Sequence, residues 1–345
     1  MSEEPIRVGI AGLGRSGWNI HAEALAAHDG YRVVAVADPL AERRAEARQR
    51  FACTAHERPE DLLADGQVEL AVIATPSHSH APLAVAALEA GRHALVEKPM
   101  AQDLGEMDTM MATAARTGHV LTCYQPYRFQ AVFTTIQEII SSGRIGRVVL
   151  VKHTQNNFQR RADWQMLRRL GGGELSNNGP HIIDEALLLI GEGPVEVFAD
   201  LKHTVGGGDA EDHVKLCLKG RSGVVVDIEL SHCCALPQPE WTIFGTRGAI
   251  QSAEGGLQVR WFDAAGLADP VLDPGPAAGR RYQRPEELPW QEEIVRPTQD
   301  RSPALRFYDR LQATLRAGAP VAVTLDSVRR QIAVIERARE MAGLR

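Results

Sequence analysis

The chain has 345 residues, enough for about two domains of ordinary size, and its composition of 44% hydrophobic and 24% charged residues is that of a globular protein. A net charge of −6 argues against nucleic acid or a membrane surface as a partner. Five cysteines without paired spacing argue against a disulfide framework or a zinc site and indicate a reducing, cytoplasmic setting. No apolar run approaches 18 residues, so no membrane span is expected.

The chain begins with the pattern of a strand, a glycine turn and a helix. An apolar, β-rich run at residues 6–11 leads directly into the turn, which consists of Gly12, Leu13, Gly14, Arg15, Ser16 and Gly17. Gly12 permits a tight turn, Gly14 lets a pyrophosphate approach the backbone, and Gly17 lets the helix pack close to the strand. The start of the helix offers free N–H groups and a positive dipole end. We therefore expect these six residues to bind a dinucleotide.

A second strand, residues 31–37, ends in an acidic residue, Asp38. It lies 21 residues after Gly17, where a dinucleotide site places the acid that bonds the ribose 2′-hydroxyl. An acid there repels a 2′-phosphate, so NAD is expected and NADP is less favoured, although Arg43 and Arg44 keep NADP open. A helix is predicted for Ala41 to Phe51, and capping it is an alternative role for Asp38, compatible with the first.

Two further strands continue the alternation of strands and helices. Residues 68–74 form a buried run that ends in the segment Thr75-Pro76-Ser77-His78-Ser79-His80, a helix is expected over 81–90, and a short strand over 93–96. This order predicts a doubly wound parallel sheet. Thr75, Pro76 and His80 are candidate cofactor contacts. No metal is expected, because two histidines at i and i+2 lack a third ligand; their alternative role is in the turn and the helix cap.

The fourth of these strands ends in Glu97 and Lys98, followed by Pro99. Open parallel sheets bind ligands outside the carboxyl ends of their strands, so both side chains are expected at a ligand. The alternative is a solvated loop with an incidental ion pair. A further strand, 120–123, is followed by Tyr124 and Gln125, which we expect near the nicotinamide end of the cofactor.

The ordered motifs together resemble those of the Gfo/Idh/MocA family of NAD(P)-dependent oxidoreductases. They are G-L-G-R-S-G at 12–17, A-T-P-S-H-S-H at 74–80, V-E-K-P-M at 96–100, R-I-G-R-V at 144–148, G-G-G-E-L-S-N-N-G-P-H-I-I-D at 171–184 and W-T-I-F-G-T-R-G at 241–248. The resemblance covers nearly the whole chain without identifying a substrate. It implies a Rossmann domain at 1–123 and a substrate-binding and oligomerisation domain at 124–345, with an open, mostly antiparallel sheet covered by helices on one face. The C-terminal helices are expected to pack back on the first domain.

The residues of the second half agree with such a sheet. Runs rich in β-formers occur at 148–154, 195–203, 214–218, 224–230 and 241–244, and a final helix is predicted over 326–341. The Pro-, Gly- and Ala-rich stretch 264–279 is predicted to be a loop. An apolar sheet face needs covering, so a homo-oligomer is expected, and the resemblance implies a homodimer or homotetramer.

A polar stripe follows three glycines in this half. Asn177, His181 and Asp184 stand at i, i+4 and i+7 and would share one face of a helix. A core histidine is the alternative for His181, but the resemblance implies that it is the catalytic histidine. Many family members carry aspartate where this chain has Asn177. Asparagine cannot accept a proton, although it can bond a sugar hydroxyl or orient His181.

The resemblance implies a dehydrogenase that acts on a secondary alcohol of a sugar, cyclitol or related polyol. His181 would take the hydroxyl proton, Lys98 would stabilise the alkoxide, and Glu97 would hold the nicotinamide ribose or Lys98. A cis peptide before Pro99 is also implied. The candidate substrate contacts are Lys98, Arg128, Arg161, Asp163, Trp164, Asn177 and His181. Trp164 would stack on a sugar ring or serve as packing. Two alternatives are an NAD-dependent glycoside hydrolase and a non-catalytic NAD-binding regulator.

Overall fold

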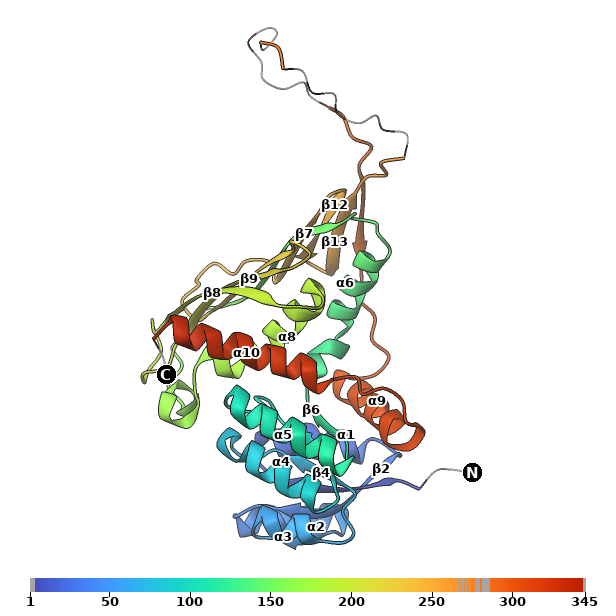
Figure 1. Cartoon of the computed structure of the whole chain (residues 1–345), viewed down its shortest axis with the longest axis vertical. Helices are drawn as coiled ribbons and strands as arrows, with labels where there is room; N and C mark the ends of the chain where they lie inside the picture. Colours follow the sequence, from blue (N-terminus) through green and yellow to red (C-terminus); the bar gives the residue numbers. More distant parts are fainter. Residues whose placement is uncertain are drawn as a thin grey trace.

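The computed structural model describes residues 4–265, 267, 270, 272, 274–276, 280 and 286–343. Residues 266, 268, 269, 271, 273 and 277–279 of the loop expected at 264–279 lie outside the described residues. Two β-sheets organise the described part, one of six strands and one of eight (Figure 1). None of the helices described is at once long and apolar enough to cross a bilayer.

The first sheet is parallel throughout and has the order β3-β2-β1-β4-β5-β6. Its strands are β1 (Ile6–Ala11), β2 (Tyr31–Ala37), β3 (Thr54–His56), β4 (Leu70–Ile73), β5 (His93–Val96) and β6 (Leu121–Cys123). Consecutive residues of β4 are all buried, as in a sheet covered on both faces. The predicted doubly wound sheet is confirmed, and its strand order reverses between β1 and β4, where such sheets bind their ligands.

Helices connect these strands. They are α1 (Glu23–Ala26), which a π-helical segment Gly17–Ala22 precedes, α2 (Ala41–Phe51), α3 (Pro59–Ala64), α4 (His80–Glu89) and α5 (Leu104–Thr117). The helix expected after the glycine turn therefore starts as a π-helix rather than as a regular α-helix. The helix predicted from Ala41 to Phe51 is confirmed at both ends.

The second sheet has the order β14-β13-β12-β11-β7-β10-β9-β8 and is antiparallel except between β10 and β7. Its strands are β7 (Val148–Asn156), β8 (Val195–Lys202), β9 (His213–Gly220), β10 (Val225–Ser231), β11 (Trp241–Gly245), β12 (Gly248–Ala253), β13 (Gly256–Trp261) and β14 (Gln291–Val295). The five predicted runs are all strands. The predicted fold class, a parallel Rossmann-type sheet followed by a mostly antiparallel one, is confirmed.

Four helices accompany the second sheet in sequence. They are α6 (Ala131–Ser141), α8 (Gly179–Ile190), α9 (Pro303–Ala317) and α10 (Leu325–Met341), and the single turn α7 (Glu174–Asn177) precedes α8. In Figure 1, α8 and α10 lie on the side of the second sheet that faces the first sheet. Val328 and Ile332 of α10 join the core of the first sheet, whereas Val334, Ile335 and Ala338 join that of the second. Helix α10 therefore ties the two sheets together.

Candidate active site

The glycine turn lies between the end of β1 and the loop after β4. Gly12 has φ +90°, and a Cβ atom there would come within 2.6 Å of the Ala74 carbonyl oxygen. A Cβ atom at Gly17 would lie 1.8 Å from the Gly12 carbonyl oxygen, so only glycine fits either position. Above Gly14, by contrast, nothing lies within 4 Å of the Cβ position. The backbone at Gly14 is open, and the positions of Gly12 and Gly17 exclude side chains. A dinucleotide pyrophosphate therefore fits against this turn.

Asp38 is fixed at the carboxyl end of β2 and is only 3% exposed. Its Oδ2 accepts a hydrogen bond from the Leu13 N–H at 2.8 Å, and its Oδ1 accepts one from the Leu40 N–H at 2.9 Å. The second bond forms a turn before α2 rather than a cap on that helix, since the N-cap residue is Leu40. Arg43 Nη1 lies 3.3 Å from Asp38 Oδ2. The carboxylate thus connects the glycine turn to the start of α2.

His80 connects the loops that follow β4 and β5. Its Nδ1 lies 2.8 Å from the Pro99 carbonyl oxygen and its Nε2 lies 2.8 Å from the Thr75 carbonyl oxygen. The residue is 1% exposed, and burial lowers the pKa of His80. The Thr75 hydroxyl pairs with Ser79 Oγ at 2.7 Å, and Pro76 is exposed. His80 therefore connects the loop after β4 to the loop after β5. Its role as a direct cofactor contact stays a prediction.

Glu97 is buried at the end of β5, so the solvated loop considered for it is wrong. His21 Nε2 lies 3.2 Å from Oε1, the Lys98 N–H donates to Oε2 at 2.9 Å, and the other ring nitrogen of His21 meets the Tyr308 hydroxyl at 2.7 Å. Burial alone would raise the pKa of Glu97, but His21 and Lys98 outweigh it and hold that pKa at about 2. The Lys98–Pro99 peptide is cis, as the resemblance implies.

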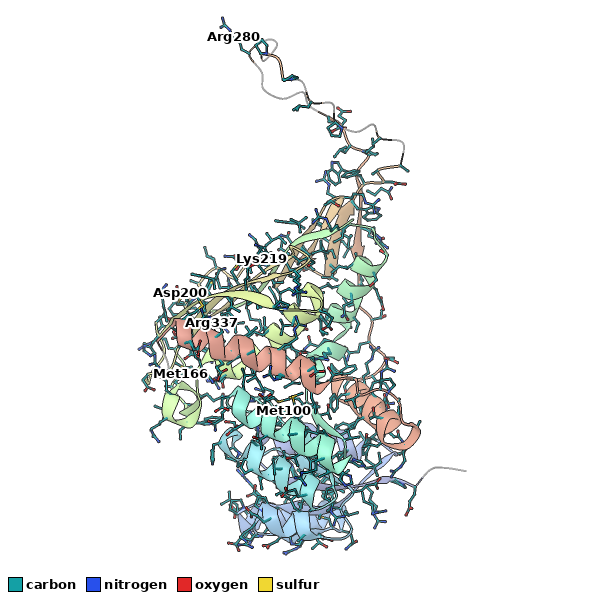
Figure 2. The ribbon with its side chains drawn as sticks, viewed as in Figure 1. Met100, Met166, Asp200, Lys219, Arg280 and Arg337 are labelled. Atoms are coloured by element: carbon teal, nitrogen blue, oxygen red, sulfur yellow. The ribbon has the colours of Figure 1, made fainter. Side chains whose placement is uncertain are left out.

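Lys98 reaches from the first sheet to the helices of the second. Its Nζ donates a hydrogen bond to the Asn177 carbonyl oxygen at 2.8 Å, four residues before His181. Figure 2 shows neighbouring Met100 at this junction, beneath α10. Burial lowers the pKa of Lys98, against the opposing charge of Glu97. Lys98 and His181, which come from different halves of the sequence, are therefore brought to one place.

His181 is a neutral, oriented imidazole at the start of α8. Its Nδ1 lies 2.9 Å from Gln125 Oε1, and its ring stacks on Tyr127 with centroids 4.1 Å apart. Because the amide oxygen only accepts, Nδ1 carries the hydrogen and Nε2 is left as the acceptor. Burial and the nearby charge of Lys98 lower the pKa of His181 to about 3. Gln125 orients the ring, whereas Asn177 uses its Oδ1 to accept from Gln165 Nε2 at 3.1 Å.

The continuous polar face expected through Asp184 does not form. The helix breaks at Asn178 between α7 and α8, and Asp184 is 2% exposed. Its two oxygens each accept from the Arg128 guanidinium at 2.6 Å. Arg128 also donates to Ser327 Oγ and the Ala322 carbonyl oxygen. The structure therefore uses Arg128, expected as a substrate contact, to join α8 to α10 and to the segment before it.

The remaining candidates lie in the segment after β7. Trp164 is 58% exposed, so it is not a packing residue. Asp163 accepts from the Gln165 N–H at 2.9 Å and from Arg161 Nε at 2.8 Å, which occupies both of its oxygens. Sequence reasoning missed His21, Tyr127, Tyr308 and Glu174. The only signal for Glu174 was a charged residue among the small residues at 171–179.

Comparisons with known proteins find similarity in both halves of the chain. Residues 6–125 match the model of an oxidoreductase family with an NAD-binding Rossmann fold, and residues 133–251 match the GFO/IDH/MocA C-terminal domain. The uncharacterized oxidoreductase C26H5.09c of Schizosaccharomyces pombe is 32% identical over 71% of this chain and 70% of its own. The scyllo-inositol 2-dehydrogenase (NADP(+)) IolW of Bacillus subtilis is 30% identical over 62% of this chain and 60% of its own.

Two further proteins extend the likeness. The myo-inositol 2-dehydrogenase of Thermotoga maritima is 27% identical over 71% of this chain and 74% of its own. The crystal structure of an NAD-binding protein from Listeria innocua superposes with a TM-score of 0.83 at 26% identity, over 99% of this chain and 95% of that one. The likeness therefore extends through both sheets.

Proposed function

The chain belongs to the Gfo/Idh/MocA family of oxidoreductases, and on this premise we propose that it is an NAD-dependent dehydrogenase acting on a secondary alcohol of a sugar, cyclitol or related polyol. The observation that carries the proposal is the approach of Lys98 to the segment of His181, through the 2.8 Å bond to Asn177. In this proposal residues 1–123 hold the cofactor, and residues 124–345 hold the substrate and the contacts between subunits. The relatives named as inositol dehydrogenases support a cyclitol or sugar.

The residues of the site divide the chemistry between them. The glycine turn would hold NAD, which would supply the acceptor for the hydride. His181 takes the hydroxyl proton on Nε2, because Gln125 holds the hydrogen on Nδ1 and the lowered pKa keeps the ring neutral at pH 7. Lys98 donates from its ammonium group to the oxygen as negative charge develops there. Glu97, held by His21, keeps the backbone of Lys98 in place.

NAD is proposed over NADP because of Asp38. A buried carboxylate at the end of β2 repels a 2′-phosphate and can accept a bond from a ribose hydroxyl. Arg43, 3.3 Å from that carboxylate, reduces the repulsion, so we expect a preference rather than an absolute choice. IolW, whose name gives NADP(+), marks the alternative within the family.

A panel of polyols separates the candidate functions. The purified chain is mixed with NAD and each of a set of inositols and sugars while NADH absorbance is recorded, beside a chromogenic glycoside assay. Steady NADH formation supports the dehydrogenase. Aglycone release without NADH accumulation would identify the glycoside hydrolase instead, and neither signal with intact NAD binding would identify the regulator.

We also propose that the chain forms a homodimer or homotetramer through the second sheet. Phe198, Phe244 and Ile294 are 54%, 42% and 47% exposed on strands β8, β11 and β14. Such side chains on a broad sheet are covered at low cost by a second copy. Light scattering at micromolar concentration should give a multiple of the 37.7 kDa chain mass, and a single chain mass would contradict this.

A cytoplasmic setting is proposed from the cysteines. All of them are free thiols: Cys53, Cys123, Cys217, Cys233 and Cys234. Free thiols persist where the surroundings are reducing. Fractionation of the source cells should therefore recover the protein with the soluble cytoplasmic markers.

A further inference from the structure

The connection between β7 and α7 concentrates positive charge in an otherwise acidic chain. Residues 160–169, called the basic segment below, contain four arginines and one aspartate, whereas the whole chain has a net charge of −6. Arg160, Arg168 and Arg169 are exposed, and their guanidinium groups form no ion pair or hydrogen bond with the described residues. A guanidinium stays charged at all ordinary pH values. These three groups are therefore available to an anionic ligand.

Three acidic residues lie in or beside the basic segment, and none of them forms an ion pair with its exposed arginines. Both oxygens of Asp163 accept hydrogen bonds, one of them from Arg161 Nε at 2.8 Å. Asp209 Oδ1 accepts from the backbone N–H of Arg168 at 2.9 Å. Glu211 is buried, and burial raises its pKa, with the charge of Arg168 among those that oppose the shift. The positive charge of the segment is thus only partly balanced.

Backbone contacts fix the middle of the basic segment. The Met166 side chain is 1% exposed, and its carbonyl oxygen accepts from the Asp209 and Ala210 N–H groups at 3.0 and 3.1 Å. A Cβ atom at Gly208 would lie 2.1 Å from the same oxygen, so this close approach requires glycine. Side chains on a fixed backbone lose less conformational freedom when a ligand binds. The arginines are therefore presented on a preorganised support.

The basic segment is connected to both parts of the proposed site. Gln165 Nε2 donates to Asn177 Oδ1 at 3.1 Å, and the Asn177 carbonyl oxygen accepts from Lys98 Nζ at 2.8 Å. Gly171, two residues after the segment, has φ +76°, and a Cβ atom there would lie 3.5 Å from Ser77 Oγ in the loop after β4. The segment therefore extends from a neighbour of Lys98 toward the loop that follows β4 on the cofactor side.

An exposed aromatic side chain lies between the arginines in sequence. Trp164 is 58% exposed. An indole ring offers a flat apolar face, on which the C–H face of a sugar ring can pack, and it leaves the polar substituents of the sugar to other groups. A tryptophan with unpaired arginines on either side in sequence therefore suits a ligand that has both a ring face and an anionic substituent.

We propose that the basic segment binds a carboxylate or phosphate group of the polyol that this chain oxidises, so that the substrate is an acidic sugar or polyol derivative. The planar guanidinium presents paired N–H donors that match the oxygens of either anion. That the bound molecule is a substrate rests on the proposed dehydrogenase function, whereas the binding of the anion does not depend on turnover. A neutral inositol would leave the exposed arginines unused.

Matched sets of sugars test the proposal by direct binding. Isothermal titration of the chain saturated with NADH, which prevents oxidation, compares glucose with glucuronate and glucose 6-phosphate, and galactose with galacturonate and galactose 6-phosphate. At least one acidic sugar should bind about tenfold or more tightly than its neutral counterpart, and added salt should weaken this preference. Tighter binding of the uronates identifies a carboxylate as the recognised group, and tighter binding of the sugar phosphates identifies a phosphate.

Charge removal in the basic segment should abolish the preference. In Arg160→Gln/Arg168→Gln/Arg169→Gln the dissociation constant of the acidic sugar should rise about tenfold or more, while those of the neutral sugar and of NADH stay unchanged. The matched control removes the same number of charges at exposed arginines elsewhere and should bind every ligand as the wild type does. It replaces Arg32, Arg221 and Arg310 with glutamine.

Trp164→Ala separates the ring from the anion. Because the ring face is common to the acidic and the neutral member of each set, this variant should weaken the binding of both by the same factor. Weaker binding of the acidic sugar alone would contradict the division of roles between the tryptophan and the arginines.

Two results overturn the proposal. In the first, no acidic sugar binds more tightly than its neutral counterpart. In the second, the triple arginine variant keeps the wild-type affinity for the acidic sugar, whether or not its affinity for NADH falls. Equal oxidation of neutral polyols by the wild type and the triple variant would support the dehydrogenase and reject the acidic substrate. Arginine-dependent binding of an acidic sugar that yields no NADH from NAD would support the anion site and reject the dehydrogenase.

Discussion

The two sheets differ in how completely the chain satisfies its polar groups around Lys98 and His181. On the side of the first sheet, both oxygens of Glu97 and both of Asp38 have partners at 3.2 Å or less. His80 joins the loops after β4 and β5, because one of its ring nitrogens donates to a carbonyl oxygen at 2.8 Å. The cofactor side is thus held in place by contacts within the chain itself.

The side of the second sheet is different. Among the described residues, the buried atoms on this side without a hydrogen-bond partner include Asn177 Nδ2, Glu174 Oε1 and His232 Nδ1. Each such group costs about 1–3 kcal/mol when it stays unpaired. Because unpaired polar groups near Lys98 and His181 lower the stability of the fold, their presence indicates a role in binding a ligand. The first-sheet side is preorganised, and the second-sheet side keeps hydrogen-bonding capacity that the described residues do not use.

The largest expected effect comes from removing the two groups that meet between these sides. Lys98→Ala and His181→Ala should each lower kcat roughly 10²–10⁴-fold, because the first removes the donor to the alkoxide and the second removes the general base. NAD affinity, measured by fluorescence titration, should change little, since the cofactor side keeps its contacts. His78→Ala, an exposed histidine near the turn, is the control and should keep activity. Near-normal turnover of His181→Ala would remove it as the base, and neutral Lys98 would be the next candidate.

Asp184→Asn tests whether Arg128 belongs to the scaffold. The substitution leaves a guanidinium buried without its carboxylate, which costs about 3–5 kcal/mol of unfolding free energy. Urea unfolding measures the loss. Asp61→Asn, which breaks the exposed pair with Arg58, should change stability little. A large rise in KM at unchanged stability would instead indicate that Arg128 contacts the substrate, as the sequence predicts.

Stability should depend on pH through His181. The unfolded histidine takes up a proton near pH 6.5, whereas the folded one does so only at about 3. The unfolded state therefore binds more protons between these values, and the contribution of neutral His181, present above pH 6.5, is lost as the pH falls. Its share is about 1.4 kcal/mol per pH unit. The free energy of unfolding is measured by urea at several pH values between 4 and 6.5. It should depend less steeply on pH in His181→Gln than in the wild type, and an equal dependence would contradict the buried neutral ring.

The smallest expected effect concerns the choice of cofactor. Asp38→Ser removes the charge that repels a 2′-phosphate, while Arg43 remains. We expect the dissociation constant for NADPH, divided by that for NADH, to fall about tenfold, equivalent to about 1.4 kcal/mol. Fluorescence titration of both cofactors gives this ratio. Tighter binding of NADPH than of NADH by the wild type would contradict the proposed NAD preference.

Local patterns in the sequence predicted much of the first sheet and several elements of the second. The glycine turn and the alternation around Asp38 and Lys98 depend on neighbours within about 20 residues, which a sequence displays directly. Strands β13 and β14 were missed. Four of the five residues of β14 are exposed, so this edge strand lacks the apolar alternation that marks a strand.

The site was less predictable, because its contacts join distant segments. His21 meets Tyr308 across 287 positions, and Arg128 meets Asp184 across 56. Neither pairing has a local signature, so Arg128 looked available for substrate. Gln125 was expected near nicotinamide and turns out to orient His181, a role that was considered for Asn177. Residue type and spacing indicated which side chains matter, whereas their partners required the structure.

The convergence of Lys98 and His181 on one hydroxyl is tested most directly by a crystal structure of the chain with NADH and the polyol that it oxidises. One hydroxyl oxygen should lie within hydrogen-bond reach, about 2.6–3.2 Å, of both Lys98 Nζ and His181 Nε2, with its carbon facing the nicotinamide. A polyol bound with its reacting hydroxyl in contact with neither side chain would contradict the proposed function.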